Sequence, residues 1–256
     1  MNRLNIVPNK TAPAHLKQSS KNRLVKSLLA VAFLTAAPLA AQADTLSVTI
    51  TNLTRGINFT PVLVAAHPTA SALFTEGQAA SANLQAMAEG GDISGLQTAL
   101  TTAGASIGNP AAGLLAPGAS ITSATTFLGG AGTTNPALSV VAMMLPTNDG
   151  FIGLNSITIP TTPGTYTYFV NAYDAGTEAN DEIVGGGTPG TSGFPVPAPI
   201  GSGTGGTGIP GAVAEGYAHI HRGVLGDTNS VGGLSDIDST VHRWLNPVAR
   251  VVLTVQ

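Results

Sequence analysis

A short acidic segment stands out in a chain that carries few charges. The stretch NAYDAGTEANDE, residues 171–182, holds four carboxylates, whereas only 9% of the whole chain is Asp, Glu, Lys or Arg. Its acids are Asp174, Glu178, Asp181 and Glu182. Carboxylates at this density could bind a hard cation, form a catalytic pair or lie in a solvated turn. The segment lacks the D-x-[DN]-x-[DN]-G spacing of an EF-hand loop, so a calcium site would need oxygens from elsewhere.

Asp149 is a candidate for one of those distant oxygens. It lies in the turn sequence PTNDGF, within a region that predicts three successive strands at 137–145, 151–159 and 165–173. If these strands run up and down as neighbours, the turn with Asp149 and the end of the third strand lie at the same end of the sheet. Asp174 directly follows the third strand, so we expect the two carboxylates to meet there.

Asp149 and Asp174 are therefore the predicted metal ligands, and calcium is the predicted ion. Calcium takes about six to eight oxygen ligands, so Glu178, Asp181 and Glu182 are candidate auxiliary ligands. The alternative is that Asp149 only stabilises its Asn-Asp-Gly turn and that the acids at 178–182 are solvated.

Two histidines offer a different metal chemistry. His219 and His221 lie in a predicted strand at 216–223, where residues two apart share a face and could bind one transition metal. His242 or Asp227 could supply a third ligand. This pattern supports an alternative function, a metal-dependent hydrolase that uses both histidines with a nearby acid. A packing pair is the simpler interpretation, because two histidines alone do not complete a metal site.

The rest of the sequence offers no recognisable catalytic set. No Ser/His/Asp combination stands out, and the chain has no cysteine. GSGTGG at 201–206 fits G-x-G-x-x-G by composition, but Pro-rich sequence precedes it where a dinucleotide-binding fold needs a strand. We therefore expect no catalytic residue and no organic cofactor.

The elements that must position these residues are mostly strands. Short β-branched runs alternate with Gly-rich and Pro-rich turns, which predicts an all-β antiparallel sandwich. The further strands are expected at 45–54, 60–67, 122–128 and 247–255. One or two short helices follow the second of these, at 71–91, with Ser81 as N-cap and Gly90 as stop, and at 93–104.

The first 43 residues predict a secretory signal peptide. A basic region without acids precedes the apolar run SLLAVAFLTAAPLAA and the A-x-A sequence AQA. That run is shorter than the roughly 20 residues that span a bilayer, so no transmembrane segment is expected after cleavage. Export would place residues 44–256 in the periplasm or the medium.

The predicted mature chain is a single acidic domain, residues 44–256. Four arginines remain against all thirteen acids, which gives a formal charge of −9. Such a surface repels phosphate backbones and attracts cations, so nucleic acid is not an expected partner. Within the domain, the Gly- and Pro-rich segment at 185–211 is expected to be a flexible, exposed loop.

Several segments, taken in order, resemble the spondin N-terminal domain family. SVTITNLT with FTPVLVAAH resembles its opening strands, and SANLQAMAEGGDISGLQTAL resembles its helical segment. MMLPTNDGFIGLNSITI is similar to the family pattern PSPDWxVG, AYDAGTE to YDAGTD, and WLNPVARVVLTV to the closing PxARVxL. Together these segments span residues 45–255.

The resemblance implies a β-sandwich of the calcium-and-lipid-binding type without enzymatic activity. It implies an extracellular adhesion or matrix-binding module, with a cell-surface protein or glycan as partner. It also implies a calcium ion held by the aspartates that match Asp149 and Asp174. A further acidic ligand of the family lies on the strand before Asp149, but this sequence has no acid between Asp92 and Asp149.

Overall fold

The computed structural model describes residues 43–197, 200–201 and 203–256. All of the predicted signal peptide except Ala43 lies outside these residues, so it stays a prediction. The described chain forms, in order, β1 Asp44–Asn52, β2 Asn58–Phe59, β3 Leu63–His67, α1 Ala82–Gly90, α2 Ser94–Thr102, β4 Ser106–Ile107, β5 Ser120–Thr122, β6 Phe127–Gly129, β7 Ala137–Leu145, β8 Gly150–Thr158, β9 Gly164–Asp174, β10 His219–Ile220 and β11 Ala249–Val255.

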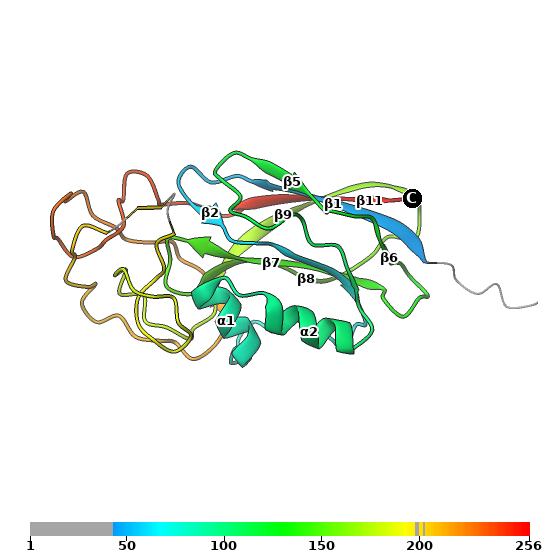
Figure 1. The fold of residues 1–256 in the computed structure, drawn as a ribbon, viewed down its shortest axis with the longest axis horizontal. Coiled ribbons are helices and arrows are strands. Elements are labelled where there is room, and N and C mark those ends of the chain that lie inside the picture. The colour runs from blue at the N-terminus through cyan, green and yellow to red at the C-terminus, as the bar shows by residue number, and fades with distance from the viewer. Residues whose placement is uncertain (1–42, 198–199, 202) are drawn as a thin grey trace, which may run out of the picture. The chain divides into compact units, whose positions relative to one another are not determined.

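The strands form one antiparallel sheet that rolls over on itself. Its order is β4-β3-β7-β8-β9-β11-β1-β5, with β10 beside β9, β2 beside β7 and β6 beside β1. The half that contains β3, β7 and β8 faces the half that contains β9, β11 and β1 across an apolar core (Figure 1). The predicted all-β sandwich is therefore confirmed.

β7 is the central strand of this architecture because it is buried on both faces. Leu138, Val140 and Ala142 point into the sandwich core. Val141 and Met143 point the other way, into a second apolar cluster with the helices. Burial on both faces explains why ALSVVAMML is a continuous apolar run and not an alternating one.

The two predicted helices are present on the outer face of the sheet, where α1 packs on β7 and β8 and α2 packs on β3 and β4 (Figure 1). The Ser81 hydroxyl caps α1 by accepting the Leu84 N–H at 3.2 Å. The chain leaves α1 through Gly91, which adopts a left-handed φ of 72° that glycine tolerates without strain. Leu84 and Met87 lie on the buried face, as their helical spacing predicts.

Two predicted strands differ from the observed ones. The 122–128 segment does follow β1, but Thr122 lies opposite Thr49 while Phe127 lies opposite Leu46. Between these two pairs lie four residues, 123–126, on one side and two, 47–48, on the other, and the extra residues separate β5 from β6. The strand expected at 216–223 is reduced to β10, His219–Ile220.

The three strands that carry the predicted metal ligands run up and down as neighbours, as expected. β7 pairs with β8, and β8 pairs with β9, both antiparallel. The β7–β8 turn and the end of β9 therefore lie at the same end of the sandwich. The long connection between β9 and β11 also gathers at that end (Figure 1).

Part of the 185–211 segment packs against the domain. Phe194 is 1% exposed and forms a small apolar cluster with Val224 and Ile237. The Gly190 N–H donates to the buried Glu89 carboxylate of α1 at 2.6 Å. These contacts attach the segment to the helix and to the loops after β10.

The limits of the domain, residues 44–256, remain a prediction. None of the helices in the described residues has the length and apolar character needed to span a membrane.

Candidate metal centre

The turn between β7 and β8 places the carboxylate of Asp149 in the interior. The Thr147 hydroxyl closes this turn by donating to the Met144 carbonyl at 2.6 Å and accepting the Gly150 N–H at 3.0 Å. Asp149 is 0% exposed, and its Oδ2 accepts the N–H groups of Thr177 at 2.7 Å and Glu178 at 3.1 Å. Its Oδ1 is shielded and has no hydrogen-bond partner.

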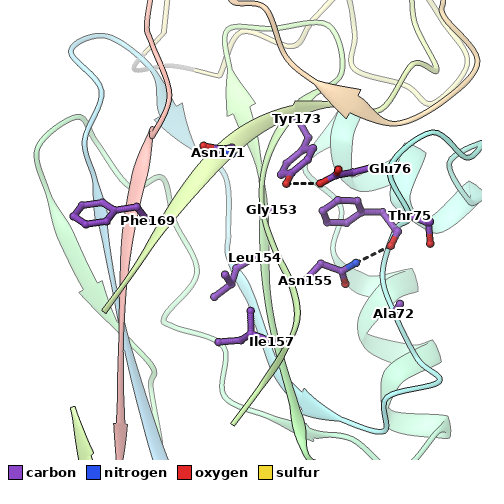
Figure 2. A pocket seen from close by; sticks show the side chains of 11 residues that line it. Ala72, Thr75, Glu76, Gly153, Leu154, Asn155, Ile157, Phe169, Asn171 and Tyr173 are labelled. Carbon is purple, nitrogen blue, oxygen red and sulfur yellow. Dashed lines mark hydrogen bonds between the residues drawn. The ribbon is translucent and has the colours of Figure 1, made fainter. Parts of the chain in front are cut away.

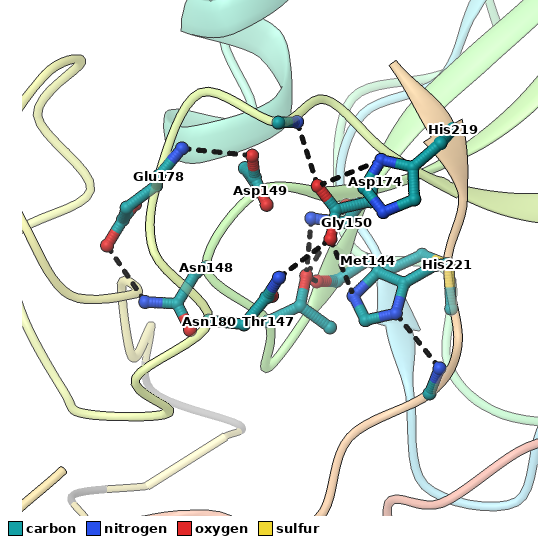
Figure 3. Close-up of polar contacts among 12 residues, drawn as sticks. Met144, Thr147, Asn148, Asp149, Gly150, Asp174, Glu178, Asn180, His219 and His221 are labelled. Atoms are coloured by element: carbon teal, nitrogen blue, oxygen red, sulfur yellow. Dashed lines mark hydrogen bonds and ion pairs between the residues drawn. The ribbon is translucent and has the colours of Figure 1, made fainter. Parts of the chain in front are cut away.

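Asp174 ends β9 and lies beside Asp149 (Figure 3). It pairs with Gly150 on one side and with His219 of β10 on the other. Its Oδ1 accepts the Gly176 N–H and its Oδ2 accepts the Asn180 amide, both at 2.8 Å. The structure thus brings the two predicted ligands together, and their binding of calcium stays a prediction.

The charge balance of this pair is unfavourable without a cation. Burial and then the neighbouring Asp174 charge raise the pKa of Asp149 to about 8, although the Glu178 and Thr177 N–H groups act in the other direction. Within the described residues, the ion-pair contacts of Asp174 are with His219 and His221. A buried carboxylate pair of this kind either holds a proton or binds a cation.

His221 contributes a proton donor to this environment. Its Nδ1 accepts the Gly223 N–H at 3.0 Å, so the neutral ring must carry its proton on Nε2. That Nε2 lies 3.9 Å from Asp174 Oδ2, and the ring packs edge-on against Trp244 with ring centroids 5.0 Å apart. Burial lowers the pKa of His221 to about 4, so the ring is neutral at pH 7.

This protonation argues against the alternative in which both histidines share one ion. A protonated Nε2 has no lone pair for a metal, and Nδ1 is already occupied by Gly223. The two residues suggested as a third ligand, His242 and Asp227, have other hydrogen-bond partners. His242 contacts the Asp238 carbonyl at 3.1 Å, and Asp227 accepts N–H groups from its own loop, including Ser235 at 3.0 Å.

His219 belongs to a different group of ligands. Single ligand atoms of Asp174, Glu215 and His219 all lie within 4.8 Å of one another. Glu215 was not among the residues predicted to bind a metal, although it lies only four residues before His219 in EGYAHIH. An acid and a histidine at that spacing beside a predicted strand would have been the available signal.

Two of the three acids at 178–182 are buried and Asp181 is half-buried, which corrects the alternative expectation that these acids are solvated. Glu178 is 6% exposed and Glu182 is 3% exposed. Glu178 Oε1 accepts the Asn148 amide at 2.8 Å and the Gly193 N–H, while its Oε2 is shielded and unpartnered. Burial raises the pKa of Glu178. Among the candidate auxiliary ligands, Glu178 therefore keeps an oxygen available.

Glu182 and Asp181 instead hold loops together. The Glu182 carboxylate accepts N–H groups from Leu225 at 2.6 Å and Gly226 at 2.8 Å, and the Ser235 hydroxyl at 2.7 Å. Asp181 Oδ1 accepts the amide of Asn148 at 2.9 Å. The sequence could not show these partners, because they come from distant loops.

A groove of about 540 Å³ lies where β8 and β9 diverge (Figure 2). The pairing of these strands ends at Gly153 and Asn171, which opens the sheet beyond that point. The Tyr173 hydroxyl donates to Glu76 at 2.8 Å on its wall, and Asn155 donates to the Phe74 carbonyl at 2.6 Å. Its volume is within the range of small-molecule sites.

The sequence comparisons agree with this architecture. The family model Spondin_N matches residues 51–182, which is just over half of the chain. The matched range contains Asp149 and Asp174 and ends before Glu215 and His219. No curated protein matches the chain.

Proposed function

Because the chain belongs to the Spondin_N family of non-catalytic, extracellular-type modules, we propose that it is an exported binding module with a calcium-ordered loop end. The ion is held between Asp149 and Asp174. The binding partner of the module is a protein or glycan at the cell surface or in the extracellular matrix. The groove between β8 and β9 is the candidate contact surface, because it presents an acid, amides and aromatic rings.

The observation that carries the calcium proposal is the pair of buried, uncompensated carboxylates. Asp149 and Asp174 are 0% and 2% exposed, and Asp149 Oδ1 has no partner. His221 supplies no positive charge at pH 7, because burial lowers its pKa to about 4. A divalent cation would neutralise both acids and satisfy the free oxygen.

The donor set fits calcium. Calcium prefers carboxylate, carbonyl and water oxygens in flexible geometry. Asp149 Oδ1 is free, and each Asp174 oxygen accepts one protein hydrogen bond and so keeps a lone pair. Glu178 Oε2 is a further shielded oxygen in the same loop region. A bound ion would cross-link the β7–β8 turn to the chain after β9, so it would stabilise this end of the sandwich.

Export rests on the predicted signal peptide and on the extracellular type of the family. The predicted mature chain contains no lysine and has a formal charge of −9 from four arginines and thirteen acids. This charge raises the local concentration of cations around the domain. It is consistent with a module that works where free calcium is abundant.

Two other functions compete with this proposal. A metal-dependent hydrolase would need His219 and His221 on one ion, which the Gly223 N–H bond to His221 disfavours. A purely structural surface protein without an ion would leave the Asp149 carboxyl protonated near neutral pH. The hydrolase alternative predicts metal-dependent turnover of a substrate. The structural alternative predicts that calcium does not change the stability of the protein.

The test is thermal melting of the exported protein in calcium and in chelator. Calcium at about 100 times its Kd should stabilise the fold by about 2.7 kcal/mol, which corresponds to a Tm rise of roughly 5–10 °C for this size. Asp174→Asn should abolish the rise, whereas Asp92→Asn, in an exposed loop, should keep it. An unchanged Tm of the wild type in saturating calcium would remove the ion from the proposal.

A further inference from the structure

A second group of ligands lies on the β10 side of Asp174. Single ligand atoms of Asp174, Glu215 and His219 come within 4.8 Å of one another, and Asp149 does not belong to this group. The pairing of His219 with Asp174 across β10 and β9 brings the imidazole to the carboxylate. His219 Nδ1 lies 4.0 Å from Asp174 Oδ1 (Figure 3).

An unpartnered carboxylate oxygen beside Asp174 points to a missing cation. Glu215 Oε2 is shielded from solvent yet has no hydrogen-bond partner, although the residue itself is half-buried. The nearby donor does not satisfy these acids, because the buried His221 Nε2 is itself unpartnered and lies 3.9 Å from Asp174 Oδ2. Two carboxylates this close repel each other, and a shielded acceptor without a donor is unfavourable.

We propose that Asp174, Glu215 and His219 form a second cation position that takes a zinc-class transition metal. The imidazole nitrogen decides the class, because zinc and its neighbours accept nitrogen with carboxylate oxygen, whereas calcium takes oxygen only. The position shares Asp174 with the calcium proposal but does not depend on it, since Glu215 and His219 are additional.

His221 faces the shared carboxylate and is not a ligand. The Gly223 N–H bond to Nδ1 fixes the ring proton on Nε2, which lies 3.9 Å from Asp174 Oδ2 and makes no hydrogen bond to it. The two oxygens of Asp174 are held instead by the Gly176 N–H and the Asn180 amide.

Three protein ligands leave one tetrahedral position open. The side chain of His219 is 30% exposed and Glu215 is half-buried, so the open position is reached from solvent. Three-ligand zinc sites accept water or an outside ligand there. A donor side chain of a binding partner could occupy it.

Ligation through His219 Nδ1 requires the ring proton to move. This Nδ1 lies 3.1 Å from the Tyr217 carbonyl, which can only accept a hydrogen bond, so the metal-free ring carries its proton on Nδ1. Metal binding through Nδ1 shifts the proton to the other ring nitrogen, Nε2.

Isothermal titration with zinc chloride, in protein first stripped with chelator, tests the proposal. We expect one zinc per chain in the wild type, with at least about a tenfold weaker Kd for His219→Gln and for Glu215→Gln. His242→Gln is the matched control and should bind as the wild type does. Circular dichroism establishes that each variant is folded. Wild-type affinity in both ligand variants would overturn the proposal.

Cobalt provides a second readout that does not depend on stability. The visible absorption of bound Co²⁺ should report low coordination number and nitrogen ligation, and it should change in His219→Gln. Asp149→Asn separates the two metal proposals, because it should lose the calcium response and keep zinc. If the wild type binds zinc but shows no calcium response, the zinc position is supported and the calcium site is refuted. If it responds to calcium but does not bind zinc, the calcium site is supported and the zinc position is refuted.

Discussion

His221 Nε2 lies 3.9 Å from Asp174 Oδ2, and the Gly223 N–H bond to Nδ1 fixes the proton on the nitrogen that faces the carboxylate. The two side chains are each 2% exposed, so solvent does not screen them. The stability of this end of the sandwich should therefore depend on pH. His221 and the neighbouring Asp149 should change it in opposite directions as pH rises, and substitution of each residue separates the two effects.

His221 should destabilise the fold as pH falls. Its ordinary pKa of 6.5 is lowered to about 4 by burial, so between these values the unfolded chain binds a proton that the native state does not. Stability from this group is therefore full above pH 6.5 and is lost down to about pH 4. Urea unfolding with chelator present should show a shallower loss over this range in His221→Gln. A slope unchanged by the substitution would contradict the prediction.

Asp149 should act in the opposite direction in metal-free protein. Its pKa is raised from 3.8 to about 8, so between these values the native state holds a proton that the unfolded chain has released. Stability from this group therefore falls as pH rises through that window and is constant above it. Asp149→Asn should flatten this fall in chelator and should also lose the calcium response. Asp92→Asn, exposed at the start of α2, serves as the control.

Glu182 should stabilise the loops without binding the ion. Glu182→Gln keeps the shape but loses the charge that accepts the Leu225 and Gly226 N–H groups, which should cost about 2 kcal/mol. Urea unfolding measures this loss, and hydrogen exchange should accelerate at those two amides. The calcium shift in Tm should persist. Loss of that shift would instead make Glu182 a ligand.

Gly176 should be required for the position of the 215–219 segment. Its φ is +68°, and a β-carbon there would lie 2.6 Å from the Tyr217 nitrogen. Gly176→Ala should therefore displace the segment and weaken zinc binding without changing a ligand. Gly77 has a φ of +77° with open space around it, so Gly77→Ala includes the backbone strain without the collision. Equal zinc affinities in the two variants would contradict the prediction.

The signal peptide predicts a defined mature terminus. The A-x-A sequence AQA ends at Ala43, and β1 begins at Asp44. Mass spectrometry of the exported protein should find Asp44 as the first residue. A mature chain that retains the basic residues before position 27 would refute cleavage here.

The sequence by itself determined the sandwich, the helices and the meeting of Asp149 with Asp174. The periodicity of strands and helices depends on the order of apolar residues, and short turns make successive strands neighbours, so nearby sequence is enough to predict these features. The Ser81 cap of α1 and the continuous apolar run of β7 are likewise visible in nearby sequence.

Only the tertiary structure decided the surroundings of this pair. Glu215 and His219 reach Asp174 after a long Gly- and Pro-rich connection that carries no periodic pattern, and the pairing of β10 with β9 positions them. Glu178 and Glu182 are buried because distant loops supply their N–H donors. The proton position on His221 depends on a single N–H from Gly223. Contacts between segments far apart in sequence therefore set the protonation and ligand identity, which residue types alone do not specify.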